Sequence, residues 1–204
     1  MCMSVAVIRY NAGNIRSVEN ALRRIGVQPV VTDDPAEIRA AERVIFPGQG
    51  EASNTMEYLR RSGLDAVIRS LTQPVLGICI GQQLLCAHSE EGDVECLGLY
   101  PGTPVRHFSS LWSEPAKIPH IGWNTVRGLS SPLFSGIEEG SFVYFIHSYC
   151  VPLSPFTIAR TEYGGVEFSA AMRHRNFYAT QFHPEKSGSI GEQLLRNFIL
   201  HCHD

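Results

Sequence analysis

The sequence has no long hydrophobic run, no strong excess of one charge and no cysteine pair spaced as Cys-x-x-Cys. No apolar stretch approaches the roughly 18 residues that a membrane-spanning helix needs. The net charge of −3 over 204 residues gives no reason to expect nucleic acid or an anionic membrane as a partner. The start, from Met1 to Ser4, leads into an apolar strand without a signal-peptide pattern. We therefore expect a soluble protein.

The cysteines are scattered along the chain, and their spacing argues against a zinc ribbon or a redox motif. They are Cys2, Cys79, Cys86, Cys96, Cys150 and Cys202. A chain of this length builds a full core without disulfides, so reduced thiols in the cytoplasm are the simpler expectation. The tail His201-Cys202-His203 has metal-binding side chains, but such ends are more often frayed. We expect neither a metal nor a cofactor.

The first half of the chain alternates between strand-like and helix-like segments. Apolar strands are expected at residues 4–10, 29–32, 43–46 and 75–78, and helices at 15–25, 35–41 and 53–71. Asn14 is expected to be the N-cap of the first helix, after a turn at 11–13. Strands that alternate with helices favour an α/β fold with a mostly parallel central sheet, flanked by helices on both faces.

After residue 90, repeated prolines interrupt the helical pattern. Short strands are expected at 97–100, 122–126, 142–146, 157–161, 168–173 and 177–180, before a last helix at 189–201. We interpret these strands as a smaller β-hairpin region on the same domain, so residues 1–204 are expected to form a single domain.

The segment from Pro74 to Leu85, PVLGICIGQQLL, contains the pattern Gly-x-Cys-x-Gly between a strand and a helix. This is the thiol form of the nucleophile elbow, a tight strand-to-helix turn that presents a nucleophile. Small residues on either side of Cys79 relieve the crowding in such a turn. The helix N-terminus favours a thiolate over a thiol. Taken alone, the pattern fits a buried cysteine between two packing glycines equally well.

A cysteine nucleophile needs a base and a group that orients the base. His183 is the strongest candidate for the base because Glu185 follows it two positions later. At the end of a strand, residues two apart point to the same face, so Glu185 is expected to accept a hydrogen bond from the imidazole. A surface turn explains most isolated His-Pro-Glu sequences, but the combination with Cys79 favours a catalytic site.

The same chemistry needs an oxyanion hole. The backbone N–H of Ile80, directly after Cys79, is one expected donor. The second is expected from Gln49, in the loop Gly48-Gln49-Gly50 at the end of another strand. Open parallel sheets place their sites at this edge. By itself, the loop is more simply read as a plain strand-to-helix turn.

Three segments resemble the signature blocks of class I glutamine amidotransferases, in order and in spacing. They are FPGQGEAS, GICIGQQLL and QFHPEKS, starting at residues 46, 77 and 181. Three more, YNAGNIRSVENAL, IPHIGWNTV and YFIHSY, resemble the glutaminase subunits of imidazole glycerol phosphate synthases, which act in histidine biosynthesis. The resemblance covers nearly the whole chain and implies a flavodoxin-like class I glutamine amidotransferase fold.

This resemblance implies catalytic roles for Cys79, His183 and Glu185. It also implies that L-glutamine is the substrate and that a separate (β/α)8 cyclase subunit receives the ammonia. Glutamine binding is implied for side chains at Gln83 and Glu91, and for backbone groups at Gly50, Ser148 and Tyr149. Contacts with the cyclase subunit, near the mouth of the ammonia passage, are implied for His120, Trp123 and Asn124.

The residues leave alternatives open. Gln83 lies one helical turn after Cys79, but it and Glu91 are also ordinary surface residue types. A tryptophan in Gly-Trp-Asn is usually packed in a core. Gln49 departs from the branched apolar residue that the family more often carries. Two other functions remain open: a glutaminase for anthranilate, pyridoxal phosphate or guanine nucleotide synthesis, and a non-catalytic regulatory subunit.

Overall fold

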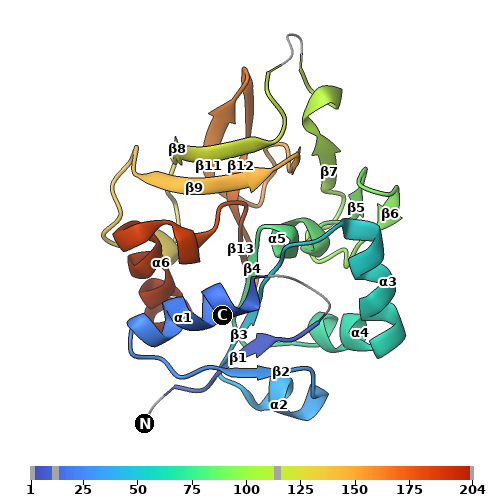
Figure 1. The fold of residues 1–204 in the computed structure, drawn as a ribbon, viewed down its shortest axis with the longest axis vertical. Coiled ribbons are helices and arrows are strands. Elements are labelled where there is room, and N and C mark those ends of the chain that lie inside the picture. Colours follow the sequence, from blue (N-terminus) through green and yellow to red (C-terminus); the bar gives the residue numbers. More distant parts are fainter. Residues whose placement is uncertain (1–2, 11–13, 113–115, 203–204) are drawn as a thin grey trace.

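A seven-stranded sheet forms the centre of the molecule in the computed structural model, which describes residues 3–10, 14–112 and 116–202 (Figure 1). The strand order is β11-β12-β13-β4-β3-β1-β2. Five neighbouring strands are parallel: β13 (Phe177–Thr180), β4 (Val75–Ile78), β3 (Arg43–Phe46), β1 (Val5–Ile8) and β2 (Val30–Thr32). The hairpin of β11 (Thr157–Tyr163) and β12 (Val166–His174) adds an antiparallel edge. The expected mostly parallel sheet is confirmed.

Helices cover both faces of this sheet (Figure 1). One face packs against α1 (Ile15–Arg24) and α6 (Gly188–His201). The other packs against α2 (Pro35–Ala40), α3 (Ala52–Ser62), α4 (Leu64–Arg69) and α5 (Ile80–Leu85). Since both faces are covered, β1, β3, β4 and β13 are buried throughout, which explains their continuous apolar runs. Within the described ranges, no helix combines the length and apolar character needed to cross a bilayer.

The second half of the chain adds two small sheets. The antiparallel ribbon of β8 (His120–Thr125) and β9 (Phe142–His147) lies next to α6 (Figure 1). A four-stranded sheet has the order β10-β7-β5-β6, with β5 (His88–Ser89), β6 (Val94–Glu95), β7 (Pro104–His107) and β10 (Tyr149–Cys150). Its β5–β7 pair is parallel, so this region contains more than the expected hairpins. Short 3-10 helices are η1 (Phe108–Ser110), η2 (Pro132–Phe134) and η3 (Pro184–Lys186).

Two predicted elements are wrong. The single helix expected at 53–71 is two helices, because Gly63 adopts a left-handed φ of 74° that ends α3 before α4 begins. The strand expected at 97–100 is irregular. The N–H groups of Leu97 and Tyr100 donate instead to the carbonyls of Leu84 and Leu85, at 2.8 and 2.9 Å. This segment satisfies carbonyls that the end of α5 would otherwise leave unpaired.

Asn14 occupies the expected N-cap position of α1, but its side chain makes no capping hydrogen bond. Its amide donates to the carboxylate of Glu185, far along the chain. The expected turn at 11–13, the first two residues and His203 of the tail lie outside the described residues. Cys202 of that tail is fully buried in the core.

Candidate functional site

Three adjacent parallel strands end at one edge of the sheet. Their order is β13-β4-β3, and the register pairs Thr180 with Ile78 and Phe46 with Gly77. The segments that follow these strands begin at Gln181, Cys79 and Pro47 respectively. The parallel pairing therefore brings the three sequence motifs to one place, at the carboxyl ends of the strands, as expected for an open α/β sheet.

The turn at Cys79 has the expected elbow geometry. Cys79 has φ 55° and ψ −106°, a left-handed φ that costs a non-glycine residue about 1–3 kcal/mol. Its N–H donates to the carbonyl of Thr180 at 2.7 Å, which anchors the turn to β13. A Cβ atom on Gly77 would lie 2.9 Å from the backbone of Gly81, and one on Gly81 would overlap the carbonyl of Phe46. The two glycines are thus needed for space on both sides of the sulfur.

His183 and Glu185 make the expected contact. His183 Nδ1 donates to Glu185 Oε1 at 2.7 Å, and both side chains are completely buried. The reason given from the sequence is wrong, however, because Glu185 lies on η3 and not on a strand. The turn of η3 after Pro184 brings the carboxylate back to the ring. The backbone of His183 is held by Tyr144, whose carbonyl accepts its N–H at 2.9 Å.

The protonation of His183 is set by its two neighbours. Burial lowers its pKa, but the sulfur of Cys79 and the carboxylate of Glu185 outweigh this effect and raise the pKa to about 10. Because Nδ1 is bound to Glu185, the other ring nitrogen, Nε2, is the one that can interact with the sulfur of Cys79. Nε2 is buried and has no hydrogen-bond partner among the described residues. The arrangement supports a charged imidazolium between a sulfur and a carboxylate.

Cys79 differs from the other described cysteines, all of which are free thiols. Burial raises the pKa of the thiols of Cys96 and Cys150 to about 12, and that of Cys202 to about 11. The pKa of Cys86 is raised even further by burial. Only Cys79 of this group lines the cavity described next.

A cavity of about 370 Å³ opens at the elbow. It is lined by every residue that the sequence predicts for catalysis, the oxyanion hole and substrate binding except Glu185, which lies behind His183. These residues are Gln49, Gly50, Cys79, Ile80, Gln83, Glu91, Ser148, Tyr149 and His183. The lining also includes Pro119, Ile146 and His147, to which the sequence analysis assigned no role although they lie in the IPHIGWNTV and YFIHSY segments.

A further missed residue contacts the sulfur itself. Gln181 Nε2 donates to Cys79 Sγ at 3.7 Å, and its Oε1 accepts from Gln83 Nε2 at 3.0 Å. Gln83 Nε2 also donates to the carbonyl of Tyr149 at 2.9 Å. The N–H groups of Gln83 therefore hold the cavity wall together. The available signal was the position of Gln181 at the start of the QFHPEKS block.

Glu91 places a carboxylate in the cavity wall. Its Oε2 accepts from the N–H of Ala52 at 2.8 Å, at the first residue of α3. Burial raises the pKa of this carboxyl group, and the nearby charge of Glu51 adds to the effect. Since the carboxylate has only this partial compensation, it is suited to bind a cationic group on a ligand.

The loop after β3 packs tightly against the residue that follows Cys79. A Cβ atom on Gly48 would overlap the side chain of Ile80 and lie 2.7 Å from the hydroxyl of Tyr10. That hydroxyl donates to the carbonyl of Pro47. Neither Gly48 nor Gly50 has a left-handed φ. Gly48 is therefore required by the lack of space and not by an unusual backbone conformation.

The expected interface residues on β8 lie in different environments. His120 is only 3% exposed and stacks on Tyr163, with ring centroids 4.0 Å apart. It is hydrogen-bonded to His147 at 3.0 Å. Burial lowers the pKa of His120 to about 4 and that of His147 to about 3, so both rings are neutral. The side chain of Asn124 donates to the carbonyl of Glu162 at 2.8 Å. His120 therefore packs in the interior beneath the ribbon. Of the three expected interface residues, only Trp123 is well exposed, at 56%.

Trp123 belongs to an apolar strip on the outer side of the β8–β9 ribbon. Register pairs Trp123 with Tyr144 and Ile121 with Ile146, so these side chains share one face. Ile121, Trp123 and Phe142 are each more than half exposed. We call these five residues the β8–β9 strip. Ile146 also lines the cavity, so the strip reaches the candidate site.

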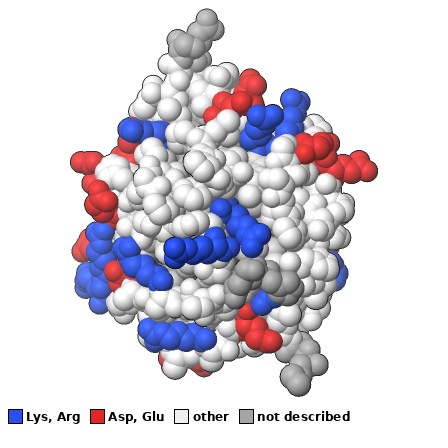
Figure 2. Space-filling view, turned by 180° about the vertical axis from the view of Figure 1, so that it is seen from behind, with Lys and Arg blue, Asp and Glu red and all other residues white. Residues whose placement is uncertain are grey.

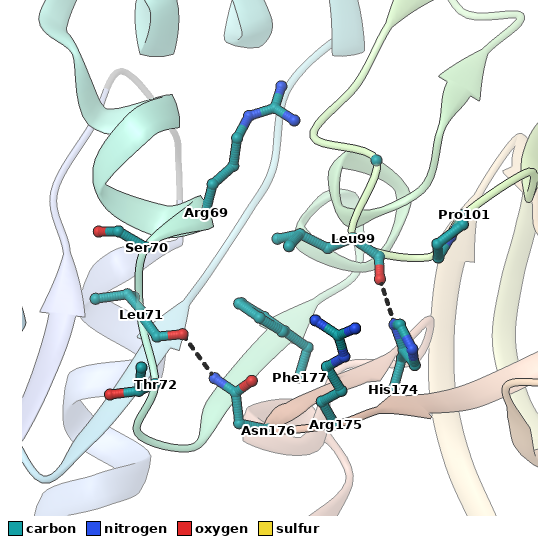
Figure 3. Close-up of a pocket in the computed structure, with 11 residues that line it drawn as sticks. Arg69, Ser70, Leu71, Thr72, Leu99, Pro101, His174, Arg175, Asn176 and Phe177 are labelled. Atoms are coloured by element: carbon teal, nitrogen blue, oxygen red, sulfur yellow. Dashed lines mark hydrogen bonds between the residues drawn. The ribbon is translucent and has the colours of Figure 1, made fainter.

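A larger cavity, of about 480 Å³, lies where β4 and β13 begin, at the opposite end of these strands. Its polar side chains tie loops together (Figure 3). His174 Nδ1 donates to the carbonyl of Leu99 at 2.8 Å, and Asn176 Nδ2 to that of Leu71 at 3.0 Å. Arg69 points away from His174 in Figure 3 and donates to the carbonyls of Leu97 and Cys96. This cavity contains no nucleophile next to a base.

Charged groups elsewhere do not suggest another centre. Figure 2 shows that basic side chains on the reverse face stand in separate groups, with neutral surface and acidic side chains between them. Among residues 3–10, 14–112 and 116–202, no cluster of three His, Cys, Asp or Glu side chains is placed to hold a metal ion.

Comparison with known proteins gives consistent matches over nearly the whole chain. A family model described as glutamine amidotransferase class-I matches residues 6–202. The imidazole glycerol phosphate synthase subunit HisH of Bacteroides fragilis is 57% identical over 197 residues, which are 97% of this chain and 99% of that protein. The protein of the same name from Bacteroides thetaiotaomicron is 54% identical over the same shares. A solved glutamine amidotransferase has a TM-score of 0.72 at 19% identity, covering 95% of this chain and 96% of that one, and shows the fold alone.

Selective alkylation tests the special position of Cys79. We expect iodoacetamide to modify Cys79 in the native protein and to leave Cys86, Cys96, Cys150 and Cys202 unmodified, because burial keeps these four as thiols. Peptide mass spectrometry after a short exposure measures this selectivity, with the unfolded protein as the control in which all five react. Equal labelling of a second described cysteine would contradict the expectation.

The charge state of the histidines can be measured by NMR titration of the ring nitrogens. His183 should lose its proton only as the pH rises through about 10, while His120 and His147 stay neutral down to about 4 and 3. A raised pKa stabilises the folded protein below the unfolded value of about 6.5, and this contribution is lost as the pH rises through about 10. In Cys79→Ala the pKa of His183 should fall. An unchanged titration there would show that the sulfur has no influence on the ring.

Proposed function

Because the chain belongs to the glutamine amidotransferase class-I family, we propose that it is the glutaminase subunit of an imidazole glycerol phosphate synthase. The observation that carries this proposal is the convergence of Cys79, His183 and Glu185 at one cavity. A nucleophile, a base and an orienting carboxylate are the three groups that amide hydrolysis through a thioester requires. Their presence argues against a non-catalytic regulatory subunit.

In the first half of the reaction, the Cys79 sulfur attacks the side-chain amide carbon of L-glutamine. The C–S bond forms as the carbonyl oxygen takes the electron pair, and the backbone N–H groups of Gln49 and Ile80 stabilise this oxyanion. When the oxyanion collapses, the C–N bond breaks and His183 gives its Nε2 proton to the departing nitrogen. Ammonia leaves, and a thioester remains on Cys79. Each oxyanion donor contributes roughly 100- to 1000-fold to the rate.

In the second half, water attacks the thioester carbon. His183 Nε2 takes a proton from the water as the C–O bond forms, and the sulfur leaves as a thiolate when the second oxyanion collapses. Glutamate is released, so the sum is glutamine and water giving glutamate and ammonia. Glu185, buried against Nδ1, keeps the ring oriented with Nε2 toward the reacting atoms and stabilises the imidazolium.

Substrate binding follows from the chemistry of the cavity wall. We assign the α-ammonium group of glutamine to Glu91, whose carboxylate is half-buried and only partly compensated. Gln83 and the backbone at Gly50, Ser148 and Tyr149 would hold the rest of the substrate. Gln181 would act indirectly, because its amide contacts the sulfur and also Gln83.

The partner is a cyclase subunit, and the β8–β9 strip is the proposed contact surface. Exposed apolar side chains of this size on one sheet face are typical of a protein interface. Ammonia released at Cys79 would pass to the cyclase, which forms imidazole glycerol phosphate and aminoimidazole carboxamide ribotide.

We propose that residues 1–204 form one glutamine amidotransferase domain. The free thiols of the described cysteines support a reducing compartment, and we place the protein in the cytoplasm.

The first test is the loss of the nucleophile. Cys79→Ala should lower glutamate release by roughly a thousandfold or more, because the thioester cannot form. The assay measures glutamate from glutamine in the presence of the cyclase subunit, with circular dichroism to verify the fold. Cys150→Ala, which removes a thiol outside the cavity, is the control and should retain activity. A Cys79→Ala protein that still releases glutamate would refute the mechanism.

The interface is tested separately. Trp123→Ala should weaken binding to the cyclase subunit by about tenfold or more, as expected for a central aromatic residue of an interface. Because the indole is exposed in this chain, the melting temperature should change little. Titration calorimetry measures the affinity, and Leu200→Ala, which removes an exposed apolar side chain from α6, is the matched control. Normal binding and normal ammonia transfer in the Trp123 variant would exclude the strip. Pull-down of a different synthase from source cells would assign another pathway.

A further inference from the structure

Asn14 combines two unusual features at the start of α1. Its backbone begins the helix, since its carbonyl accepts the N–H groups of Ser17 and Val18 at 3.1 and 3.3 Å. An N-cap residue normally has an extended backbone, and its side chain accepts a further N–H of the first turn. Asn14 has instead a left-handed φ of 71°, and its side chain caps nothing. The side chain is thus committed to another contact.

That contact is the buried carboxylate of Glu185. Asn14 Nδ2 donates to Glu185 Oε1, the same oxygen that accepts from His183 Nδ1. The carboxylate is fully buried, and its other oxygen has no partner among the described residues. The two donors therefore come from opposite directions in the chain, one from the end of β13 and one from α1. The α1 helix packs directly against η3, which carries Glu185.

We propose that Asn14 is a positioning residue for the glutaminase reaction, which holds the Glu185 carboxylate against His183. The inference rests on the function proposed above. A carboxylate with a single hydrogen bond can rotate about its last side-chain bonds, and His183 would then lose its fixed orientation. A neutral amide supplies the second hydrogen bond without adding a positive charge that would compete with the imidazolium.

Asparagine suits this position for two separate reasons. It tolerates a left-handed backbone better than most residues, and it carries a neutral N–H donor. Glycine shares the first property and lacks the second. Aspartate is as good an N-cap as asparagine, but its ionised form cannot donate. These two substitutions therefore separate a role in starting α1 from a role in orienting Glu185.

The groups that influence this buried pair are few. Cys79 faces His183 from the elbow, Glu185 from η3, and His147 from β9. His147 is neutral, as is His120 behind it. Lys186, which follows Glu185 in the chain, lies over the ring of Tyr144, with its nitrogen 6.0 Å from the ring centroid. A carboxylate introduced at position 14 would therefore interact mainly with Glu185.

The experiment compares Asn14→Gly and Asn14→Asp in the complete complex with the cyclase subunit, across a range of pH. Asn14→Gly should lower kcat for glutamate release by about tenfold or more, the usual effect of losing a hydrogen bond to a charged group. KM for glutamine should stay within about twofold, because the substrate-binding wall is untouched. The kcat of Asn14→Asp relative to wild type should rise as the pH falls. Two adjacent carboxylates then share a proton, and the protonated aspartate can donate to Glu185 as the amide does.

The control is Asn20→Asp, which makes the same change in charge on the exposed side of α1 and should follow the wild-type pH profile. A role in starting α1 predicts the opposite pattern, with Asn14→Asp as active as wild type at every pH. That result, or a wild-type kcat in both Asn14 variants, would overturn the inference. The proposed function would still hold in that case, provided that glutamate release depends on Cys79. Glutamate release that does not depend on Cys79 would instead refute the proposed function.

Discussion

The site depends on a backbone contact at the elbow. Gly81 lies so close to the carbonyl of Phe46 that no side chain fits between them, and a Cβ atom on Gly77 would lie only 2.9 Å from the backbone of Gly81. These contacts allow α5 to start directly against β3, and Cys79 between the two glycines has a left-handed φ. They also set the distance from the sulfur to the loop after β3, where Gly48 touches Ile80. The dense packing of protein interiors makes such a contact intolerant of even one added methyl group.

Three buried histidines, His183, His147 and His120, differ in charge. Burial disfavours the charged form of all three, but only His183 has a carboxylate and a sulfur close enough to reverse the effect. Burial keeps His147 and His120 neutral, and the two rings bond to each other and pack like aromatic residues, while His147 also bonds to the carbonyl of Tyr149. A single positive charge is thereby confined to the place where proton transfer is needed.

Features carried by short contiguous segments could be predicted from the sequence. The elbow, the His183–Glu185 contact and the alternation of strands and helices depend on residues close together in the chain. Features that depend on packing between distant segments could not. The roles of Gln181 and Asn14, the burial of His120 and the cavity-facing position of His147 all arise where one element meets another. Gly63 was a local signal that was overlooked, and residues 97–100 form no strand because α5 needs their N–H groups.

Ile146 couples ligand binding in the cavity to protein binding on the β8–β9 ribbon. This residue belongs to both the β8–β9 strip and the cavity wall, and its carbonyl lies 3.8 Å from the Cys79 sulfur. A ligand in the cavity and a protein on the strip would therefore share one residue of β9. Linkage requires that any increase in glutamine affinity caused by the partner be matched by an equal increase in partner affinity caused by glutamine. An empty subunit would then release its partner more readily than one that is loaded with substrate.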